Sequence, residues 1–223
     1  MTADSSGGAE RQGMQQHWET WYQDGDTPWE DGQPWRPLPD LLSRYAPPGG
    51  RVLDIGCGMG GKAAQMASLG YRVLGIDIAA PAVAAARELA KRAGGAFEVR
   101  RADFLEASPE ATFHVAFDRG AWCNFDEQGQ RSFAERVTHW LVPGGHWISL
   151  TGCADNRDPE TGEPDPRGYP RHSLQDIVAC CERDFEVLEV TRQPFGATPD
   201  TDFTAWVTIL RARPESRLPS EPR

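Results

Sequence analysis

Hydrophobic residues along the chain form short runs that alternate with amphipathic stretches. The runs predict strands at 51–55, 72–76, 97–101, 113–117, 146–150, 185–190 and 205–210. Apolar positions three and four residues apart predict helices at 62–68, 81–92, 130–141 and 174–183. Strands that alternate with helices predict an α/β fold: a mostly parallel, seven-stranded sheet with helices on both faces.

The end of the pattern differs from the rest, because the last two strands follow each other with no helix between them. Only the Pro- and Gly-rich stretch 193–202 separates them. We therefore expect the last strand to be antiparallel to its neighbours. Local signals support the helices: Pro81 fits a first turn, and Ser173 with Asp176 resembles a capping box.

The polar residues are unevenly distributed and divide the chain into four parts. Residues 1–13 and 214–223 are polar and lack apolar periodicity, so we expect two disordered tails. A tryptophan-rich cap segment is expected at 14–48, and one domain with a full core at 49–213.

A glycine-rich turn follows the first strand and precedes a helix. Gly56, Gly58 and Gly61 satisfy G-x-G-x-x-G in that context, which lets a ligand approach the backbone at a helix N-terminus. Asp77 ends the second strand, 21 residues after Gly56. A carboxylate at that position can accept hydrogen bonds from both hydroxyls of a ribose.

Three kinds of ligand compete for this turn. A phosphate-binding loop would need a hydroxyl after Lys62, but Ala63 stands there. A dinucleotide would bring its pyrophosphate close to the negative Asp54. A cationic cofactor with an adenosine end would be attracted by Asp54, so we favour it.

The motif order VLDIGCGMG, GIDIA, RADF, FDRGAW and LVPGG, over residues 51–150, resembles class I S-adenosylmethionine-dependent methyltransferases. The resemblance implies a Rossmann-like, doubly wound sheet, S-adenosylmethionine as cofactor, S-adenosylhomocysteine as product, and no metal. It places Asp54 at the methionine part, Asp77 at the ribose and Asp103 with Phe104 at the adenine. The cofactor-binding residues that it implies are Trp21, Trp29, Asp54, Gly56, Cys57, Gly58, Asp77, Ile78, Asp103, Phe104 and Asp118.

Half of the eight tryptophans lie in residues 17–42, ahead of the first strand. Trp18, Trp21 and Tyr22 have the spacing of one helix face, and we expect Trp18 to be a hydrophobic anchor. Trp29 is expected beside the sulfonium, where an indole offers cation–π attraction. The segment and FDRGAW resemble thiopurine S-methyltransferases and tellurite-resistance methyltransferases, although the LDIGCG turn departs from the thiopurine enzymes.

Charge and composition limit the partners. The 23 basic and 33 acidic residues give a net charge of −10, which opposes binding to nucleic acid or an anionic membrane. By resemblance, amino methylation of DNA bases would need a [DNS]-P-P-[FYW] block, which is absent here, so we expect a small-molecule methyl acceptor. We also expect a monomer or weak dimer. The sequence contains neither a run of about 18 apolar residues nor a secretory signal, and we expect a cytoplasmic protein.

We expect direct in-line methyl transfer to a thiol, because a thiol is partly ionised at neutral pH and an alcohol needs a base. The predicted catalytic residues are Arg119, Asp118 and His172, and the predicted acceptor-binding residues are Trp29, Arg119, Trp122 and Tyr169. His172 and Asp155, in a predicted lid at 152–172, would serve as bases for an O- or N-methyltransferase. A non-catalytic cofactor-binding module is the other alternative.

Five cysteines, an odd number without a C-x-x-C pair, predict reduced thiols. Packing is the expected role of Cys180 and Cys181. Together with Cys153 they could instead hold a soft ion, but no metal site is predicted.

Overall fold

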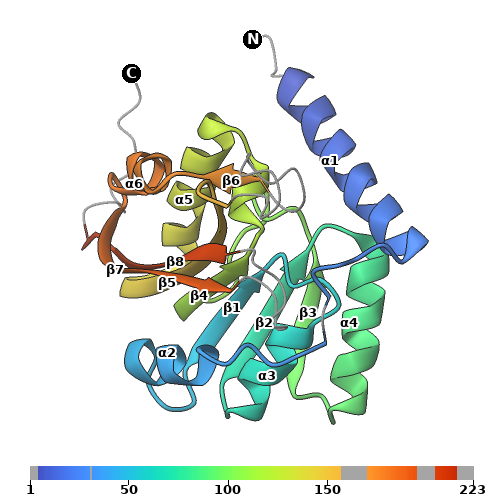
Figure 1. The fold of residues 1–223 in the computed structure, drawn as a ribbon. Coiled ribbons are helices and arrows are strands. Elements are labelled where there is room, and N and C mark those ends of the chain that lie inside the picture. Colours follow the sequence, from blue (N-terminus) through green and yellow to red (C-terminus); the bar gives the residue numbers. More distant parts are fainter. Residues whose placement is uncertain (1–4, 31, 157–169, 195–203, 215–223) are drawn as a thin grey trace.

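The computed structural model describes residues 5–30, 32–156, 170–194 and 204–214, and its strands form a single sheet (Figure 1). The strands are β1 Arg51–Ile55, β2 Arg72–Asp77, β3 Phe97–Arg101, β4 Phe113–Arg119, β5 Leu141–Cys153, β6 Arg171–His172, β7 Phe185–Pro194 and β8 Thr204–Ala212. The helices are α1 Ser5–Asp24, α2 Leu38–Tyr45, α3 Gly61–Ser68, α4 Ala80–Arg92, the short 3₁₀ helix η1 Trp122–Asn124, α5 Glu127–Trp140 and α6 Leu174–Cys181.

The sheet has the order β3-β2-β1-β4-β5-β8-β7. Strands β1 to β5 pair in parallel, whereas β8 runs antiparallel to both β5 and β7. The predicted seven strands, their mostly parallel arrangement and the antiparallel last strand are therefore confirmed. The two-residue β6, which was not predicted, pairs with the end of β5.

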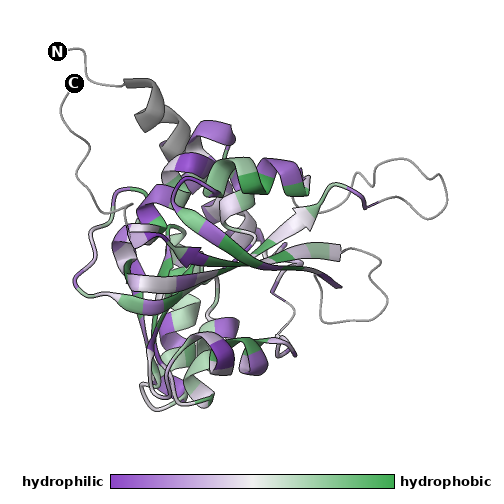
Figure 2. Cartoon of the chain, turned by 90° about the vertical axis from the view of Figure 1, so that its left-hand side faces the viewer, coloured by the Kyte–Doolittle hydropathy of each residue, from purple (hydrophilic) through white to green (hydrophobic). Residues whose placement is uncertain are grey.

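Residues that alternate along each strand face opposite layers of helices. Leu53 and Ala116 belong to the core cluster that includes residues of α5 and α6, while their neighbours Val52 and Val115 belong to the cluster that includes residues of α2 and α3. Both faces of the sheet are buried, which explains the nearly continuous apolar runs in the sequence. In the side view of Figure 2, the sheet lies between the helices.

The first helix corrects one prediction. α1 begins at Ser5, so residues 5–13 belong to a helix and not to the disordered tail that their polarity predicted. Within this stretch Ala9, Glu10, Arg11 and Gln12 favour a helix, whereas its glycines and serines do not. The helix is continuous with the turn around Trp18, which lines the pocket described below. Residues 1–4 and 215–223 lie outside the described part of the chain.

Helix α2 was missed in the sequence because prolines surround it. Pro37 stands at its N-cap and Pro39 in its first turn, where a missing N–H costs no helical hydrogen bond.

The capping box of Ser173 and Asp176 at the start of α6 is confirmed. None of the helices in the described ranges is long and apolar enough to cross a membrane.

The strand order brings the carboxyl ends of the central strands together. Ile55 lies opposite both Ile76 and Asp118 in the sheet, and Asp77 lies opposite Arg101. The connections reverse direction between β1 and β4, and in open α/β sheets a ligand binds at such a switch point.

Candidate functional site

A pocket lies at the carboxyl ends of β1, β2 and β4, beneath α1. Its volume is about 860 Å³, counting the space at its open mouth, which is in the range of ligand pockets. Residues from five parts of the chain line it: Met14, Trp18, Tyr22, Trp29, Ile55, Gly56, Ile76, Asp77, Ile78, Ala102, Asp103, Phe104, Arg119, Gly120, Ala121, Asn124, Phe125 and Phe133.

The glycine turn forms the floor of this site. Gly56 and Gly58 have φ angles of 68° and 54°, which L side chains rarely adopt. A Cβ on Gly56 would stand 2.8 Å from the Cβ of Ala121, and a Cβ on Gly58 would overlap the carboxylate of Glu30. Cys57 is buried and packs against Gly75, so it lies outside the pocket wall.

Asp77 lines the pocket with its carboxylate held by the backbone. Oδ2 accepts a hydrogen bond from the N–H of Gly58 at 2.8 Å, and Oδ1 accepts one from Ala79 at 2.9 Å. Burial raises its pKa, while these two N–H donors act in the opposite direction. Each oxygen keeps a lone pair, so the group can still accept ribose hydroxyls.

Asp54 is buried and differs from Asp77 in its partners. It is 2% exposed, and Oδ2 has no hydrogen-bond partner among the residues that the structure describes. Burial, with the nearby carboxylates of Glu30 and Asp77, raises its pKa to about 8. Asp54 does not line the pocket itself, but a cation at the glycine turn would favour its ionised form.

Asp103 and Phe104, after β3, line the side of the pocket formed by Ala102. Oδ1 of Asp103 accepts a hydrogen bond from the N–H of Leu105 at 2.9 Å. The ring of Phe104 lies 4.8 Å from that of Phe133, centroid to centroid. This part of the wall therefore combines apolar side chains with a carboxylate.

Aromatic side chains from α1 and the following loop cover the pocket. Trp29 packs against the rings of Trp18 and Trp21, each at 5.5 Å, and its Nε1–H donates to the Tyr22 hydroxyl at 2.9 Å. Burial raises the pKa of Tyr22, which keeps the hydroxyl protonated as a donor to Glu30.

The helix face toward the pocket differs from the predicted one. Met14, Trp18 and Tyr22, spaced by four residues, line the pocket. Trp18 is therefore part of the wall and more than an anchor, whereas Trp21 lies outside the wall and supports Trp29. The spacing-four stripe follows the 3.6-residue period as well as the predicted set did, so periodicity alone could not choose between them.

Arg119, at the end of β4, lines the pocket and joins it to the cap segment. Its Nη1 donates to the backbone oxygen of Trp29 at 2.8 Å. The side chain also holds Trp29 in place, and a position beside the acceptor stays a prediction.

Asp118 lies in the protein interior, which corrects its prediction as a catalytic and cofactor-binding residue. It is completely buried: Oδ2 accepts from the N–H groups of Ala121 and Trp122, both at 3.1 Å, and Oδ1 accepts from Trp147 Nε1 at 2.9 Å. Burial raises its pKa to about 6. These hydrogen bonds let the carboxylate fix the turn after β4. Because side chains alternate along a strand, the next residue, Arg119, points the other way and lines the pocket.

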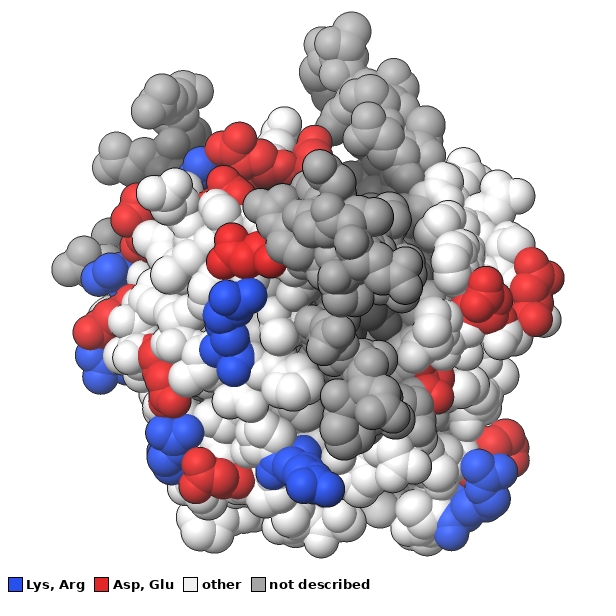
Figure 3. All heavy atoms as spheres, viewed as in Figure 1, with Lys and Arg blue, Asp and Glu red and all other residues white. Residues whose placement is uncertain are grey.

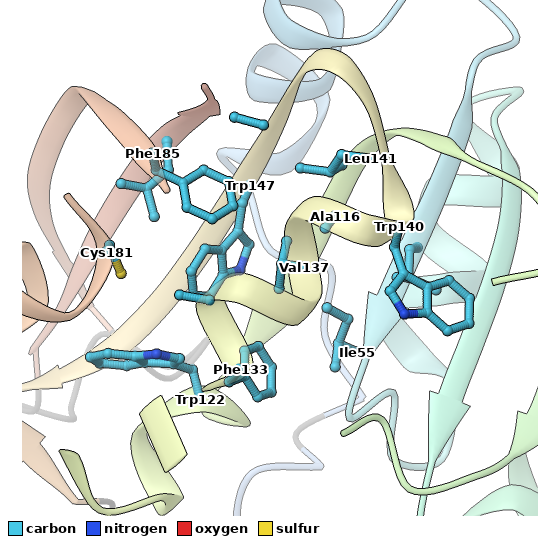
Figure 4. Close-up of a cluster of buried hydrophobic side chains, with 14 of the residues drawn as sticks. Ile55, Ala116, Trp122, Phe133, Val137, Trp140, Leu141, Trp147, Cys181 and Phe185 are labelled. Atoms are coloured by element: carbon cyan, nitrogen blue, oxygen red, sulfur yellow. The ribbon is translucent and has the colours of Figure 1, made fainter. Parts of the chain in front are cut away.

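Trp122 also belongs to the core and not to the acceptor pocket. Its ring lies near those of Phe133 and Trp147 (Figure 4), and its Nε1–H donates to the backbone oxygen of Gln130 at 3.1 Å. The side chain is 1% exposed and is absent from the described pocket wall, so the prediction is wrong for a packing reason.

The predicted bases lie outside the described wall. His172 Nε2 is 3.2 Å from both Gln130 Nε2 and the backbone oxygen of Cys123, and its ring is tilted against that of Trp122, with the centroids 5.3 Å apart. Asp155 is exposed and pairs with Arg192 at 3.7 Å. Tyr169 and most of the predicted lid fall outside the described residues.

The cysteines agree with a packing role. All five are free and buried. Within the described ranges, no group of three or more His, Cys, Asp or Glu side chains is placed to hold a metal ion.

Several pocket residues escaped the sequence reasoning, among them Asn124, Phe125 and Phe133. Asn124 and Phe125 lie between β4 and α5, and Phe133 lies within α5, where local patterns predict only a turn and an amphipathic helix. Glu30, which meets the glycine turn from far away in the sequence, was also missed. No local signal marks such contacts.

The fold and pocket define a Rossmann-like α/β protein with a ligand site at its glycine turn. The family described as Methyltransferase domain matches residues 52–145. Probable thiol methyltransferase 2 of Arabidopsis thaliana is 32% identical over 159 residues, covering 70% of this chain and 66% of that protein. Thiocyanate methyltransferase 1 of Brassica oleracea is 31% identical over 135 residues, 60% of each protein.

Solved structures support the fold. The crystal structure of 1,6-didemethyltoxoflavin-N1-methyltransferase from Burkholderia thailandensis, with 1,6-didemethyltoxoflavin and S-adenosylhomocysteine bound, gives a TM-score of 0.73 at 22% identity. The match covers 90% of this chain and 87% of that one. The chain belongs to the class I S-adenosylmethionine-dependent methyltransferases, and it spans 60–66% of the length of the two plant relatives.

Proposed function

We propose that the protein transfers a methyl group from S-adenosylmethionine to the sulfur of a small molecule. One observation carries the proposal: the described pocket wall combines aromatic rings and two carboxylates with no His, Lys, Cys or Glu side chain. Such a site can hold an adenosyl cofactor and orient an acceptor, and its described wall offers no imidazole, amine or thiolate as a general base.

The residues present fit the cofactor. Asp77 would accept the ribose hydroxyls, and Asp103 with Phe104 would flank the adenine. The orphaned Oδ2 of the buried Asp54 suits a positively charged methionine end at the glycine turn. When bound, S-adenosylmethionine supplies an electrophilic methyl group on a sulfonium.

The aromatic cover would exclude water and orient the reactants. Trp18, Tyr22 and Trp29 form the outer wall, and the hydrogen bond from Trp29 to Tyr22 fixes the indole. An indole face attracts a sulfonium by cation–π interaction, and closing the site removes competing water. The rate gain would come mainly from positioning the acceptor for in-line displacement.

A sulfur acceptor suits this wall best. The Tyr22 hydroxyl donates to Glu30. Asp77 accepts from two backbone N–H groups and Asp103 from that of Leu105, while His172 lies outside the described wall. A thiol with a pKa of about 8.5 is partly ionised at neutral pH without help. Arg119 would stabilise the thiolate by its charge.

The names of the relatives support sulfur without deciding it. Two plant relatives are named as thiol and thiocyanate methyltransferases, while the Burkholderia thailandensis structure is an N-methyltransferase. An amine that is neutral at pH 7 also needs no base before it attacks. Nitrogen is therefore the second candidate acceptor.

The surface supports a small acceptor. On the face drawn in Figure 3, Lys and Arg side chains are scattered among Asp and Glu instead of forming a basic patch. With a net charge of −10, the chain would repel a polyanion.

The test compares thiophenol, phenol and aniline as matched acceptors between pH 6 and 9, with methylated products identified by mass spectrometry. We expect methylation of thiophenol and no detectable methylation of phenol. Reactions without protein correct for direct methylation of the thiol. Faster methylation of phenol that is lost in His172→Gln would identify an oxygen methyltransferase, and preferred methylation of aniline would favour nitrogen.

A further inference from the structure

Glu30 brings a carboxylate from the cap segment onto the glycine turn. Its Oε1 accepts a hydrogen bond from the N–H of Met59 at 2.7 Å and another from the Tyr22 hydroxyl at 3.1 Å. Gly58 leaves the space that this carboxylate fills, because a Cβ there would overlap it. Glu30 is thus built into the site, although it lies far from the turn in sequence.

Three carboxylates converge on this turn: Glu30, Asp54 and Asp77. Asp77 accepts hydrogen bonds from two backbone N–H groups, but within the described part of the chain Oδ2 of Asp54 has no hydrogen-bond donor. Burial disfavours ionisation of Asp54 most, and the charge of Glu30 comes next.

Positive charge from the protein itself is scarce here. No ion pair between described residues includes Glu30 or Asp54. The ammonium of Lys62 acts on Asp54 from a distance and donates to the oxygen of Gln33 at 2.6 Å. Buried like charges without a cation are costly, and a positively charged ligand group would remove that cost.

We infer that Glu30 is a further cofactor-binding residue, which shares with Asp54 the ammonium group at the methionine end of the cofactor. The inference rests on the proposed cofactor. It gives the cap segment a direct part in binding: Glu30 follows Trp29 in the chain, so the residue that holds the ammonium group also sets the indole over the pocket.

Two ligands whose sulfur is an uncharged thioether can distinguish binding of the ammonium group by Glu30 from a purely structural role in which Glu30 holds the cap segment in place. S-Adenosylhomocysteine carries the ammonium and carboxylate, whereas 5′-methylthioadenosine has the same adenosine and thioether without them. Titration calorimetry measures both ligands on the wild-type protein and on Glu30→Gln, which keeps the size and an acceptor oxygen but loses the charge. We expect S-adenosylhomocysteine to bind about tenfold or more weakly to the variant, as for a lost charged hydrogen bond, and 5′-methylthioadenosine to change less than twofold.

Glu19→Gln is the matched control, because Glu19 fastens the same segment through Arg101 at 2.9 Å. We expect it to change the affinity for both ligands by equal factors. Circular dichroism checks folding of each variant, and Glu30→Ala gives a second measurement if Glu30→Gln is unstable. With Glu30→Ala, the loss for S-adenosylhomocysteine should still exceed that for 5′-methylthioadenosine.

Each other result overturns the inference. An equal loss of affinity for both ligands would mean that Glu30 only holds the cap segment in place. Tighter binding of S-adenosylhomocysteine to the variant would mean that the cofactor has to displace Glu30 in order to bind. Failure of the wild-type protein to bind S-adenosylhomocysteine would instead refute the proposed cofactor itself.

Discussion

Binding of S-adenosylhomocysteine should release a proton from Asp54. The carboxyl group is buried with a pKa of about 8, so about 0.9 of the molecules carry this proton at pH 7 in the free protein. A bound ammonium group would favour the ionised form and expel that proton. The dissociation constant should therefore fall about tenfold from pH 6 to pH 7, about fivefold from pH 7 to pH 8, and little above that.

Calorimetry in buffers of different ionisation enthalpy measures the released proton directly. At pH 7 the observed enthalpy should vary with the buffer, with a slope of about 0.9 proton. Asp54→Asn is the control, since an amide has no proton to release: the slope should vanish and the affinity should no longer depend on pH in this range. Buffer-independent enthalpy in the wild-type protein would refute the reasoning.

Three further predictions concern the acids and the arginine of the site. Asp77→Ala should weaken S-adenosylhomocysteine binding at least tenfold in calorimetry, because a charged acceptor for the ribose hydroxyls is lost. An unchanged affinity would show that the ribose does not bind at Asp77. Asp118→Asn should lower the free energy of unfolding by about 1–3 kcal/mol in urea, because the amide NH₂ would face an N–H group that now donates a hydrogen bond to the Asp118 carboxylate. Equal urea midpoints for the variant and the wild-type protein would contradict this structural role. Arg119→Ala should lower kcat/KM for thiophenol about tenfold or more, with a smaller effect on cofactor affinity, and Arg119→Lys should restore part of the rate; a loss confined to cofactor affinity would assign Arg119 to the cofactor.

Asp54 should also make the free protein less stable as the pH rises. Its pKa is higher in the folded state than the ordinary value of 3.8, so the folded state binds the extra proton. Stability from this group is greatest below about pH 4 and is lost progressively up to about pH 8. Asp54→Asn should therefore raise the melting temperature at pH 8 more than at pH 5, while it weakens binding of S-adenosylhomocysteine. An equal change in melting temperature at both pH values would argue against the shifted pKa.

The sequence by itself determined the sheet and the location of the site. Strands with both faces buried appear as apolar runs, and the helices between them force parallel pairing. Glycines at Gly56 and Gly58 are needed for their positive φ angles. Once the strands are parallel, acids that end them, such as Asp77, must meet at one edge.

Only the tertiary structure decided which neighbouring side chains enter the pocket. Asp118 and Arg119 are adjacent in β4, yet one is buried in the core and the other lines the site. Trp18 and Trp21 share a helix, and only Trp18 reaches the wall. A local pattern gives the period of a strand or helix, whereas the direction of each side chain depends on register and on packing with distant segments.

The contact of Glu30 with Met59 joins the cap segment to the glycine turn and is the clearest example of such long-range control. Neither residue carries a signal for the other in the sequence. Their meeting depends on how α1 lies over the sheet edge and on the space that Gly58 leaves. Sequence therefore determined where a ligand would bind, and packing between distant elements decided which charges would surround it.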